Sequence, residues 1–233
     1  MKKRIVQLFM IMVFSSIAAQ KENISSFTTV AVTYKFHPQF FLFVEGQMRG
    51  IEEYSYPDYY EIKGGIGYNL TKNHKPFIGI GRYGNYKDHD FSKEEFRIWL
   101  QDVIDFKAGK FKFENRFRAE KSWFYEPQID VHSQRVRLRY RMNISVPLNS
   151  ETVKPGTLFA NAYDEVFFIT TENPLFARNR IYGGIGYQID ENFGIASGYL
   201  WQREFGSSGN KNLHFLNCFF WHRMSLGTNC LIV

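Results

Sequence analysis

The sequence predicts an all-β protein: a single antiparallel up-and-down transmembrane β-barrel of about 10 to 12 strands that follows an N-terminal signal peptide. Three observations predict this fold. Apolar and polar residues alternate over many segments of strand length, no segment after the N-terminus is a long apolar run, and 18% of the residues are aromatic although 22% are charged. Because a strand places alternate side chains on opposite faces, this pattern gives each strand one apolar and one polar face.

The first element is an export signal over residues 1–19. Residues 2–4 are basic, an apolar stretch follows them, and Ala18-Ala19 offers a small-residue cleavage site. Cleavage after Ala18 and cleavage after Ala19 both fit the pattern. The apolar stretch is shorter than the about 20 residues of a spanning helix, which favours a signal peptide over a membrane anchor. The barrel is then expected over residues 20–233.

Export also changes the charge of the chain. Removing the three basic residues of the signal lowers the basic count from 29 to 26 against 23 acids, so the mature protein is weakly positive. A nucleic-acid partner would require a concentrated basic face in a protein that meets nucleic acid, and export excludes that class. The two cysteines, Cys218 and Cys230, have no C-x-x-C spacing, so neither a disulfide framework nor a zinc site is predicted.

Two segments in the middle of the chain carry the alternation most clearly. In the first, Phe111, Phe113, Asn115, Phe117 and Ala119 alternate with Lys110, Lys112, Glu114, Arg116, Arg118 and Glu120. In the second, Val136, Leu138, Tyr140, Met142 and Ile144 alternate with Arg135, Arg137, Arg139 and Arg141. A helix would scatter these charges around its circumference, whereas a strand places all of them on one face.

Weaker alternation along the rest of the chain brings the predicted strands to eleven. The further strands are expected at residues 27–36, 40–50, 59–70, 75–86, 94–105, 157–168, 180–189, 194–205 and 213–222. Bacterial barrels usually have an even number, so either the first hairpin is counted wrongly or an end strand is missed.

The predicted links alternate in length, as in outer-membrane barrels whose short turns are periplasmic. The short links are 71–74, 106–109 and 190–193, and the longer ones are 51–58, 87–93, 121–133, 169–179 and 206–212. The link at 147–156 is longer than its periplasmic place in this alternation predicts.

The apolar faces are predicted to point out of the barrel. Inside a closed barrel of this size the apolar rows of all strands would overfill the interior, whereas on the outside they form a band that faces lipid. Closure also pairs the backbone groups that an open sheet edge would leave unpaired in hydrocarbon. We therefore expect lipid contacts from Val136, Leu138, Tyr140, Met142 and Ile144.

A string of motifs in the second half of the chain resembles a known family. The motifs are Glu114-Asn115-Arg116-Phe117, Val146-Pro147-Leu148, the stretches at 162–168 and 179–187, and Gly198-Tyr199-Leu200. Together they resemble the outer-membrane barrel family catalogued as domain of unknown function 2490, most closely over residues 94–205. The resemblance implies a barrel in the outer membrane of a Gram-negative bacterium and implies no reaction or ligand. Such barrels usually end in a strand with a last aromatic residue, whereas aromatic residues stop here at Trp221.

The arginine-rich segments predict a charge network in the lumen. Like charges that face each other in a poorly hydrated interior repel, so carboxylates must compensate them. The expected cations are the lysines and arginines of the two segments together with Arg180, and the expected carboxylates are Glu45, Glu61, Glu95, Glu114, Glu120 and Glu165. A lumen filled by ion pairs is the first interpretation, because barrels this small leave little open space. A narrow anion-preferring passage is the alternative.

Catalytic patterns are weaker. Asp164 and Glu165 are neighbours, which point to opposite faces of a strand and cannot act jointly on one substrate. His132-Ser133 is the candidate for a lipid-modifying enzyme, because a serine nucleophile needs a histidine within hydrogen-bond reach. The six histidines lack metal-ligand spacing, and no helix pattern follows the G-x-G-x-x-G spacing that begins at Gly79.

We therefore expect a monomeric outer-membrane barrel with a structural or interaction role and no cofactor or metal. Its expected partners are membrane lipids and the outer-membrane assembly machinery. A restricted anion pore and an outer-membrane lipid hydrolase are the alternatives.

Overall fold

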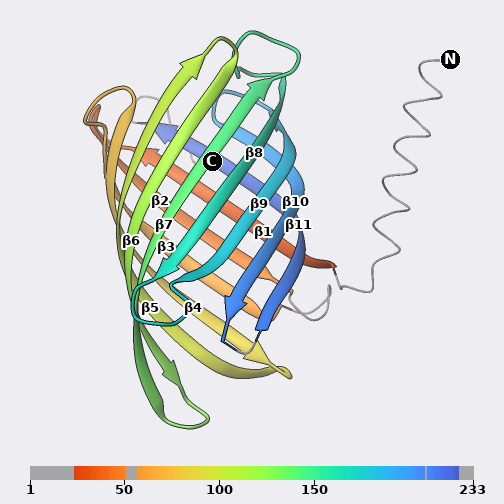
Figure 1. Ribbon diagram of the computed structural model, residues 1–233. Coiled ribbons are helices and arrows are strands. Elements are labelled where there is room, and N and C mark those ends of the chain that lie inside the picture. Colours follow the sequence, from red (N-terminus) through yellow and green to blue (C-terminus); the bar gives the residue numbers. More distant parts are fainter. Residues whose placement is uncertain (1–23, 51–56, 208, 226–233) are drawn as a thin grey trace, which may run out of the picture.

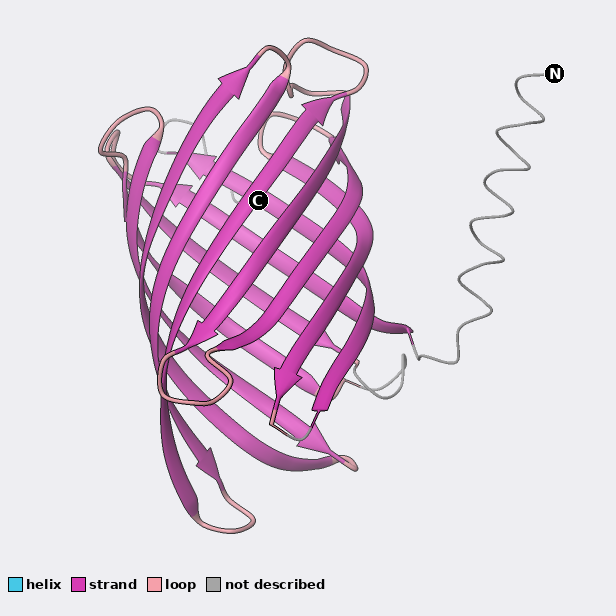
Figure 2. Ribbon diagram, viewed as in Figure 1, coloured by secondary structure: helices cyan, strands magenta, loops and turns pink. Residues whose placement is uncertain are grey.

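The computed structural model describes residues 24–50, 57–207 and 209–225, and these form one closed β-barrel without helices (Figures 1 and 2). The strands are β1 (Ile24–Lys35), β2 (Phe40–Arg49), β3 (Tyr59–Tyr68), β4 (His74–Lys87), β5 (Asp90–Ala108), β6 (Phe111–Glu126), β7 (Val131–Pro147), β8 (Thr157–Ile169), β9 (Phe176–Gln188), β10 (Phe193–Gly206) and β11 (Gly209–Ser225). Within these residues, no helix is long and apolar enough to cross a membrane. The predicted signal peptide lies outside the described residues.

The barrel closes between its first and last strands. Each strand pairs antiparallel with the next along the chain, but β1 and β11 pair parallel, with Val30 opposite Phe220. The prediction of a wholly antiparallel barrel is therefore wrong at this one pair. The reason is the odd number: a meander of eleven strands starts and ends at opposite rims, so its closing pair must be parallel. The structure thus holds eleven described strands, within the predicted range of 10 to 12.

The links between strands divide between two rims, named here as drawn in Figure 1. The lower rim carries the start of β1 and the β2–β3, β4–β5, β6–β7, β8–β9 and β10–β11 links, and the upper rim carries the others and the end of β11. The predicted division into short and long links holds only in part, because the three predicted short links are short but the links predicted to be long at 87–93 and 121–133 are short as well. The β4–β5 turn contains only Asp88 and His89, both with positive φ, whereas residues 148–156 form a long loop at the upper rim.

The strands β5, β6 and β7 are the longest of the barrel together with β11. They contain 19, 16 and 17 residues, and the β6–β7 hairpin extends beyond the other lower turns (Figure 1, green). Much of the link predicted at 121–133 is therefore paired strand, in which Tyr125 lies opposite His132.

The two faces of the sheet differ sharply in chemistry. Outward side chains are large and apolar, and Ile62 and Leu100 are 63% and 61% exposed. Inward side chains include many polar and charged ones, and Glu120 and Arg137 are 2% and 7% exposed. Both rows lie on the same strands, because neighbouring residues alternate between the faces.

Glycines let aromatic rings lie flat against neighbouring strands. The string Gly-Gly-Ile-Gly-Tyr occurs in β3 and in β9, and the third glycine of each, Gly67 and Gly186, faces a phenylalanine directly across the pair. A Cβ at either position would overlap the ring of Phe41 or Phe159. This supports close strand packing as the reason for the repeated string.

Part of the lumen is apolar, which the sequence did not predict. Phe27, Tyr182, Leu200 and Phe215 form a buried cluster on β1, β9, β10 and β11. The rings of Phe27 and Phe215 meet edge to face, with centroids 5.8 Å apart. Most of the buried charged groups lie over β5 to β9, and a smaller number lie on β2 and β3.

Candidate functional site: the charged lumen

Strand register places the two arginine-rich segments opposite each other inside the barrel. Across the β6–β7 pair, Arg118 lies opposite Arg139 and Arg116 opposite Arg141. Like charges directly opposite destabilise a sheet. The pairing therefore requires carboxylates nearby on the same inner face.

Glu120 on β6 is the first of these carboxylates, and its side chain is fully buried. Arg137 donates from Nε to Oε2 at 2.6 Å, and Arg139 donates from Nη1 to Oε1 at 2.8 Å. Arg118 approaches Oε1 at 3.4 Å, and Arg97 of β5 approaches Oε2 at 3.8 Å. One carboxylate is therefore shared by four guanidinium groups from three strands.

Glu165 on β8 is the second, and it is 2% exposed. Its Oε1 accepts hydrogen bonds from Arg116 at 2.5 Å and from Arg139 Nη2 at 2.8 Å. Arg180 of β9 approaches Oε2 at 3.8 Å. Because Arg139 contacts Glu165 and Glu120 together, the two carboxylates belong to one continuous network over β5 to β9.

An aromatic ring takes part in this network. Phe167, two residues beyond Glu165 on the same inner face, is 1% exposed. The guanidinium carbons of Arg139 and Arg180 lie 4.5 and 5.0 Å from its ring centre, and those of Arg137 and Arg178 lie 5.5 and 5.4 Å away. The ring face is electron-rich and attracts cations. Phe167 therefore helps to hold cations that the two carboxylates do not fully neutralise.

A smaller group of charges lies on β2 and β3. Lys63 contacts Glu45 at 2.5 Å and also pairs with Glu61. Glu61 further accepts a hydrogen bond from the Tyr59 hydroxyl at 2.6 Å and lies 3.5 Å from Arg49. Glu45 and Glu61 thus face inward, but they contact this group rather than the arginines of β6 and β7.

Some predicted network residues lie elsewhere. Lys110 is in the β5–β6 turn, where it pairs with the exposed Glu151 at 2.8 Å, because β6 begins one residue later. Lys112 pairs with Asp105 at 3.3 Å close to the upper rim. Arg135 pairs with Glu172 at 2.7 Å close to the lower rim.

The remaining predicted residues contribute to the inner face. Arg141 donates to Glu114 at 2.9 Å, and Arg97, which the sequence did not single out, donates to Glu95 at 2.7 Å. Two glutamines that were also missed extend the network: Gln101 accepts from Arg118 Nε at 2.8 Å, and Gln202 accepts from Arg180 at 2.6 Å. Alternation on β5 could have indicated Arg97.

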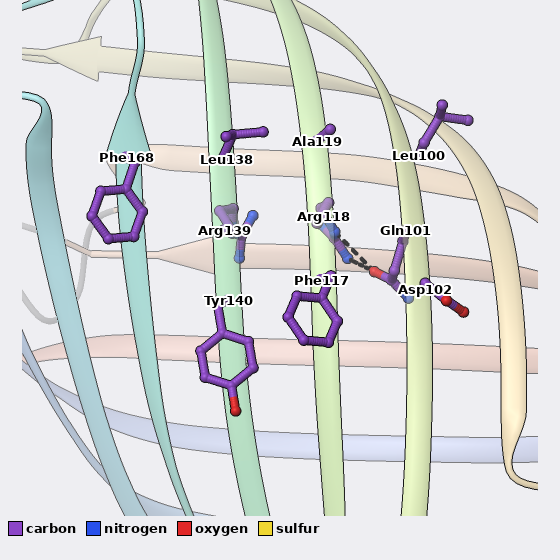
Figure 3. Close-up of a pocket in the computed structure, with 10 residues that line it drawn as sticks. All are labelled: Leu100, Gln101, Asp102, Phe117, Arg118, Ala119, Leu138, Arg139, Tyr140 and Phe168. Atoms are coloured by element: carbon purple, nitrogen blue, oxygen red, sulfur yellow. Dashed lines mark hydrogen bonds between the residues drawn. The ribbon is translucent and has the colours of Figure 1, made fainter.

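The residues predicted to face lipid lie on the outer surface. In Figure 3 the rings of Phe117, Tyr140 and Phe168 lie outside the strands, while Arg118 and Arg139 point away from the viewer into the barrel. Leu138 and Met142 are 46% and 40% exposed. Val136 and Ile144 share their parity on β7 and are partly exposed. The side chains around Ala119 line a shallow, mainly apolar groove (Figure 3).

The catalytic candidates are separated by the strands. Glu165 faces the lumen, whereas Asp164 faces outward and accepts a hydrogen bond from Asn179 at 2.5 Å. His132 and Ser133 are consecutive on β7 rather than in a loop, and the His132 ring stacks on Tyr125 at 4.7 Å. Among the described residues, no group of three histidine, cysteine or acidic side chains could hold a metal ion. Cys218 is a free thiol, and Cys230 lies outside the described residues.

Comparison with known proteins agrees with the resemblance seen in the sequence. No curated protein matches the chain. The profile of a family described as protein of unknown function (DUF2490) matches residues 24–213. This match runs from the first residue of β1 into β11, and it is wider than the stretch at 94–205 in which the motifs are clearest. The chain therefore belongs to the DUF2490 family of proteins of unknown function.

Proposed function

We propose that this protein is a monomeric barrel of the outer membrane of a Gram-negative bacterium, exported by a signal peptide at residues 1–19 and assembled by the outer-membrane machinery. We further propose that its lumen is closed by ion pairs, and that its role is structural or one of interaction rather than enzymatic. The observation that carries this proposal is the inverted distribution of side chains, with apolar residues outside and ionised residues inside. Membrane barrels have this distribution, and water-soluble barrels have the opposite one.

Aromatic residues at both rims support the membrane location. Outer aromatic side chains contact each other near strand ends, where amphipathic rings favour the lipid headgroup level. The upper pairs are Phe36–Phe40, Phe40–Tyr68, Phe106–Phe113 and Phe193–His222, and the lower pairs are Tyr60–Tyr86, Tyr125–His132 and Phe176–Phe205. Exposed aliphatic residues of the strand centres, such as Ile80, Leu100 and Leu138, lie between these two groups.

The membrane location is tested by fractionation of cells that express the full chain. We expect the protein in the outer-membrane fraction, with residues 1–19 removed, and we expect the folded barrel to migrate faster than the boiled one in a detergent gel. Recovery in the periplasm or cytoplasm as a water-soluble protein would contradict the proposal.

A narrow anion passage is the second candidate, and one observation favours it. The buried arginines of β5 to β9 outnumber the carboxylates that contact them, since Glu120 alone is shared by four. An excess of fixed positive charge attracts anions.

Planar-bilayer recordings separate a closed lumen from a passage. We expect no steady current from the purified protein or from the outward-facing control Arg82→Ala, whose side chain is 64% exposed. An anion-selective current that is weakened by Arg137→Ala combined with Arg139→Ala would replace the closed-lumen proposal with the passage.

A further inference from the structure

We propose that a pocket inside the upper rim binds a small amphipathic anion, a molecule with a flat apolar body and one carboxylate, sulfonate or phosphate group. The pocket has a volume of about 460 Å³, within the range of about 300 to 1,000 Å³ that small-molecule sites occupy. Ligand binding in this pocket goes beyond the proposed role of the barrel and does not depend on the membrane location. Its lining comes from the ends of β6 to β9 and β11, from the β7–β8 loop and from the β9–β10 turn.

The floor of the pocket is aromatic. Trp221 of β11 and Phe159 of β8 lie with ring centres 6.0 Å apart, and Phe219 stacks on Trp221 at 5.5 Å. Each floor ring covers a glycine of the neighbouring strand, Gly194 under Trp221 and Gly186 under Phe159, where a Cβ would overlap the ring. The rings are therefore held flat against the wall, which leaves apolar faces toward the pocket.

The loop over the pocket is fixed by its own hydrogen bonds. The Gly156 N–H donates to the Gln188 carbonyl at 2.8 Å, which ties the β7–β8 loop to β9. The Lys154 N–H donates to Thr157 Oγ1 at 3.0 Å, and the Leu158 N–H donates to Asn149 Oδ1 at 2.9 Å. The pocket is thus preformed, as small-molecule sites usually are.

Positive charge surrounds this apolar floor. Lys112, Lys154 and Arg223 line the pocket, and the acids that line it are Asp190 and Glu191. The N–H groups of Asn192 and Phe193 donate to the Asp190 carboxylate at 2.7 and 2.8 Å, which lowers its pKa and keeps it ionised. Lys112 also contacts Asp105, which is shared with Lys75. The lining therefore holds three cations against two acids, and this excess of one positive charge favours an added anion.

An unused donor lies in the same place. The Trp221 indole Nε1 is buried and has no hydrogen-bond partner within the described part of the chain. A buried N–H without a partner is costly and is normally satisfied. Because this N–H has no accessible surface, a ligand would pack its apolar body against the Trp221 and Phe159 rings and place its charge toward Lys154 and Arg223.

The test uses 2-naphthoate as a probe, with the neutral 2-naphthamide as its matched control. Titration calorimetry is done on the full-length barrel held in amphipol, so that the probe does not partition into micelles. We expect saturable binding of the carboxylate, with the amide weaker by about tenfold because it loses two exposed charge contacts of about threefold each. Equal affinity for the amide would overturn the proposal.

Variants then locate the site. Lys154→Gln and Arg223→Gln, both exposed, are expected to weaken binding by about threefold each, whereas Lys72→Gln in the β3–β4 turn of the same rim should leave it unchanged. Trp221→Phe reduces the aromatic surface of the floor, so it should also weaken binding. If the Trp221 variant does not assemble, the Lys154 and Arg223 variants still test whether the probe binds in this pocket. Binding that is unaffected by both would overturn the proposal.

Discussion

Glu120 concentrates much of the lumen chemistry in one side chain. It has no solvent exposure, and its two oxygens are shared by Arg97, Arg118, Arg137 and Arg139. Burying an unpaired charge costs free energy, so the four arginines need the Glu120 carboxylate as much as it needs them. Removing the carboxylate would leave several guanidinium groups facing each other without a counter-charge.

Glu120→Gln is therefore expected to lower the free energy of unfolding by about 3 to 5 kcal/mol, because it leaves buried charges uncompensated. The measurement is urea unfolding in detergent, followed by tryptophan fluorescence. Glu151→Gln is the matched control, since the Glu151 side chain is 81% exposed and pairs with the exposed Lys110. Glu151→Gln should lower the free energy of unfolding by less than about 1 kcal/mol. Equal losses in the two variants would contradict the buried network.

The glycine strands offer a test at the scale of an element. Gly186→Ala would drive a methyl group into the Phe159 ring, and the forced displacement should cost about 1 to 3 kcal/mol. Gly183→Ala, on the same strand but with no atom within 4 Å of its Cβ, should be neutral or stabilising by up to about 1 kcal/mol. Thermal or urea unfolding of both variants provides the comparison, and a larger loss at Gly183 would contradict the packing described for β9.

Alternation was sufficient to predict the centres of the strands, but not their ends. At the centre of β7, around Met142, one face of the strand lies outside the barrel and the other faces the lumen. Apolar and charged residues therefore alternate clearly in the sequence. Near the lower rim, Trp123, Phe124 and Tyr125 follow one another without alternation. Phe124 faces inward and is 6% exposed, under the cations of Lys93 and Arg135, so both faces carry aromatic residues here and hydropathy no longer distinguishes them. For this reason residues 121–126 read as a link although they form strand.

The site could be predicted only in part, for a similar reason. Strand parity placed Arg137, Arg139 and Glu165 on one inner face, and the structure brings them together. The alternation along each strand does not determine which residues lie opposite each other on neighbouring strands. The four arginines around Phe167 depend on the register of β7, β8 and β9, in which Arg139 and Arg178 both lie opposite Phe167. The apolar cluster around Leu200 depends on barrel closure, which no local pattern encodes.

At the scale of the whole molecule, one substitution distinguishes a lipid-facing surface from a water-facing one. Met142 is 40% exposed near the middle of the outer face of β7. If this face met water, Met142→Arg would leave the free energy of unfolding nearly unchanged. At the centre of a bilayer the substitution should lower it by about 2 to 4 kcal/mol. Leu148→Arg, in the loop that follows β7 and 53% exposed, is the control and should change little.

Folding into lipid vesicles of stated composition, scored by gel mobility and urea titration, measures both variants. Equal tolerance of arginine at the two positions would count against a membrane-spanning barrel.

The parallel pairing of β1 with β11 sets where the chain enters and leaves the barrel. Ile24 lies at the lower rim and Ser225 at the upper one. In a bilayer, an epitope inserted just ahead of Ile24 and another inserted directly after Ser225 would therefore lie on opposite sides of the membrane. A protease added to intact cells should then cleave one epitope and spare the other, and the spared one would report which rim faces the periplasm.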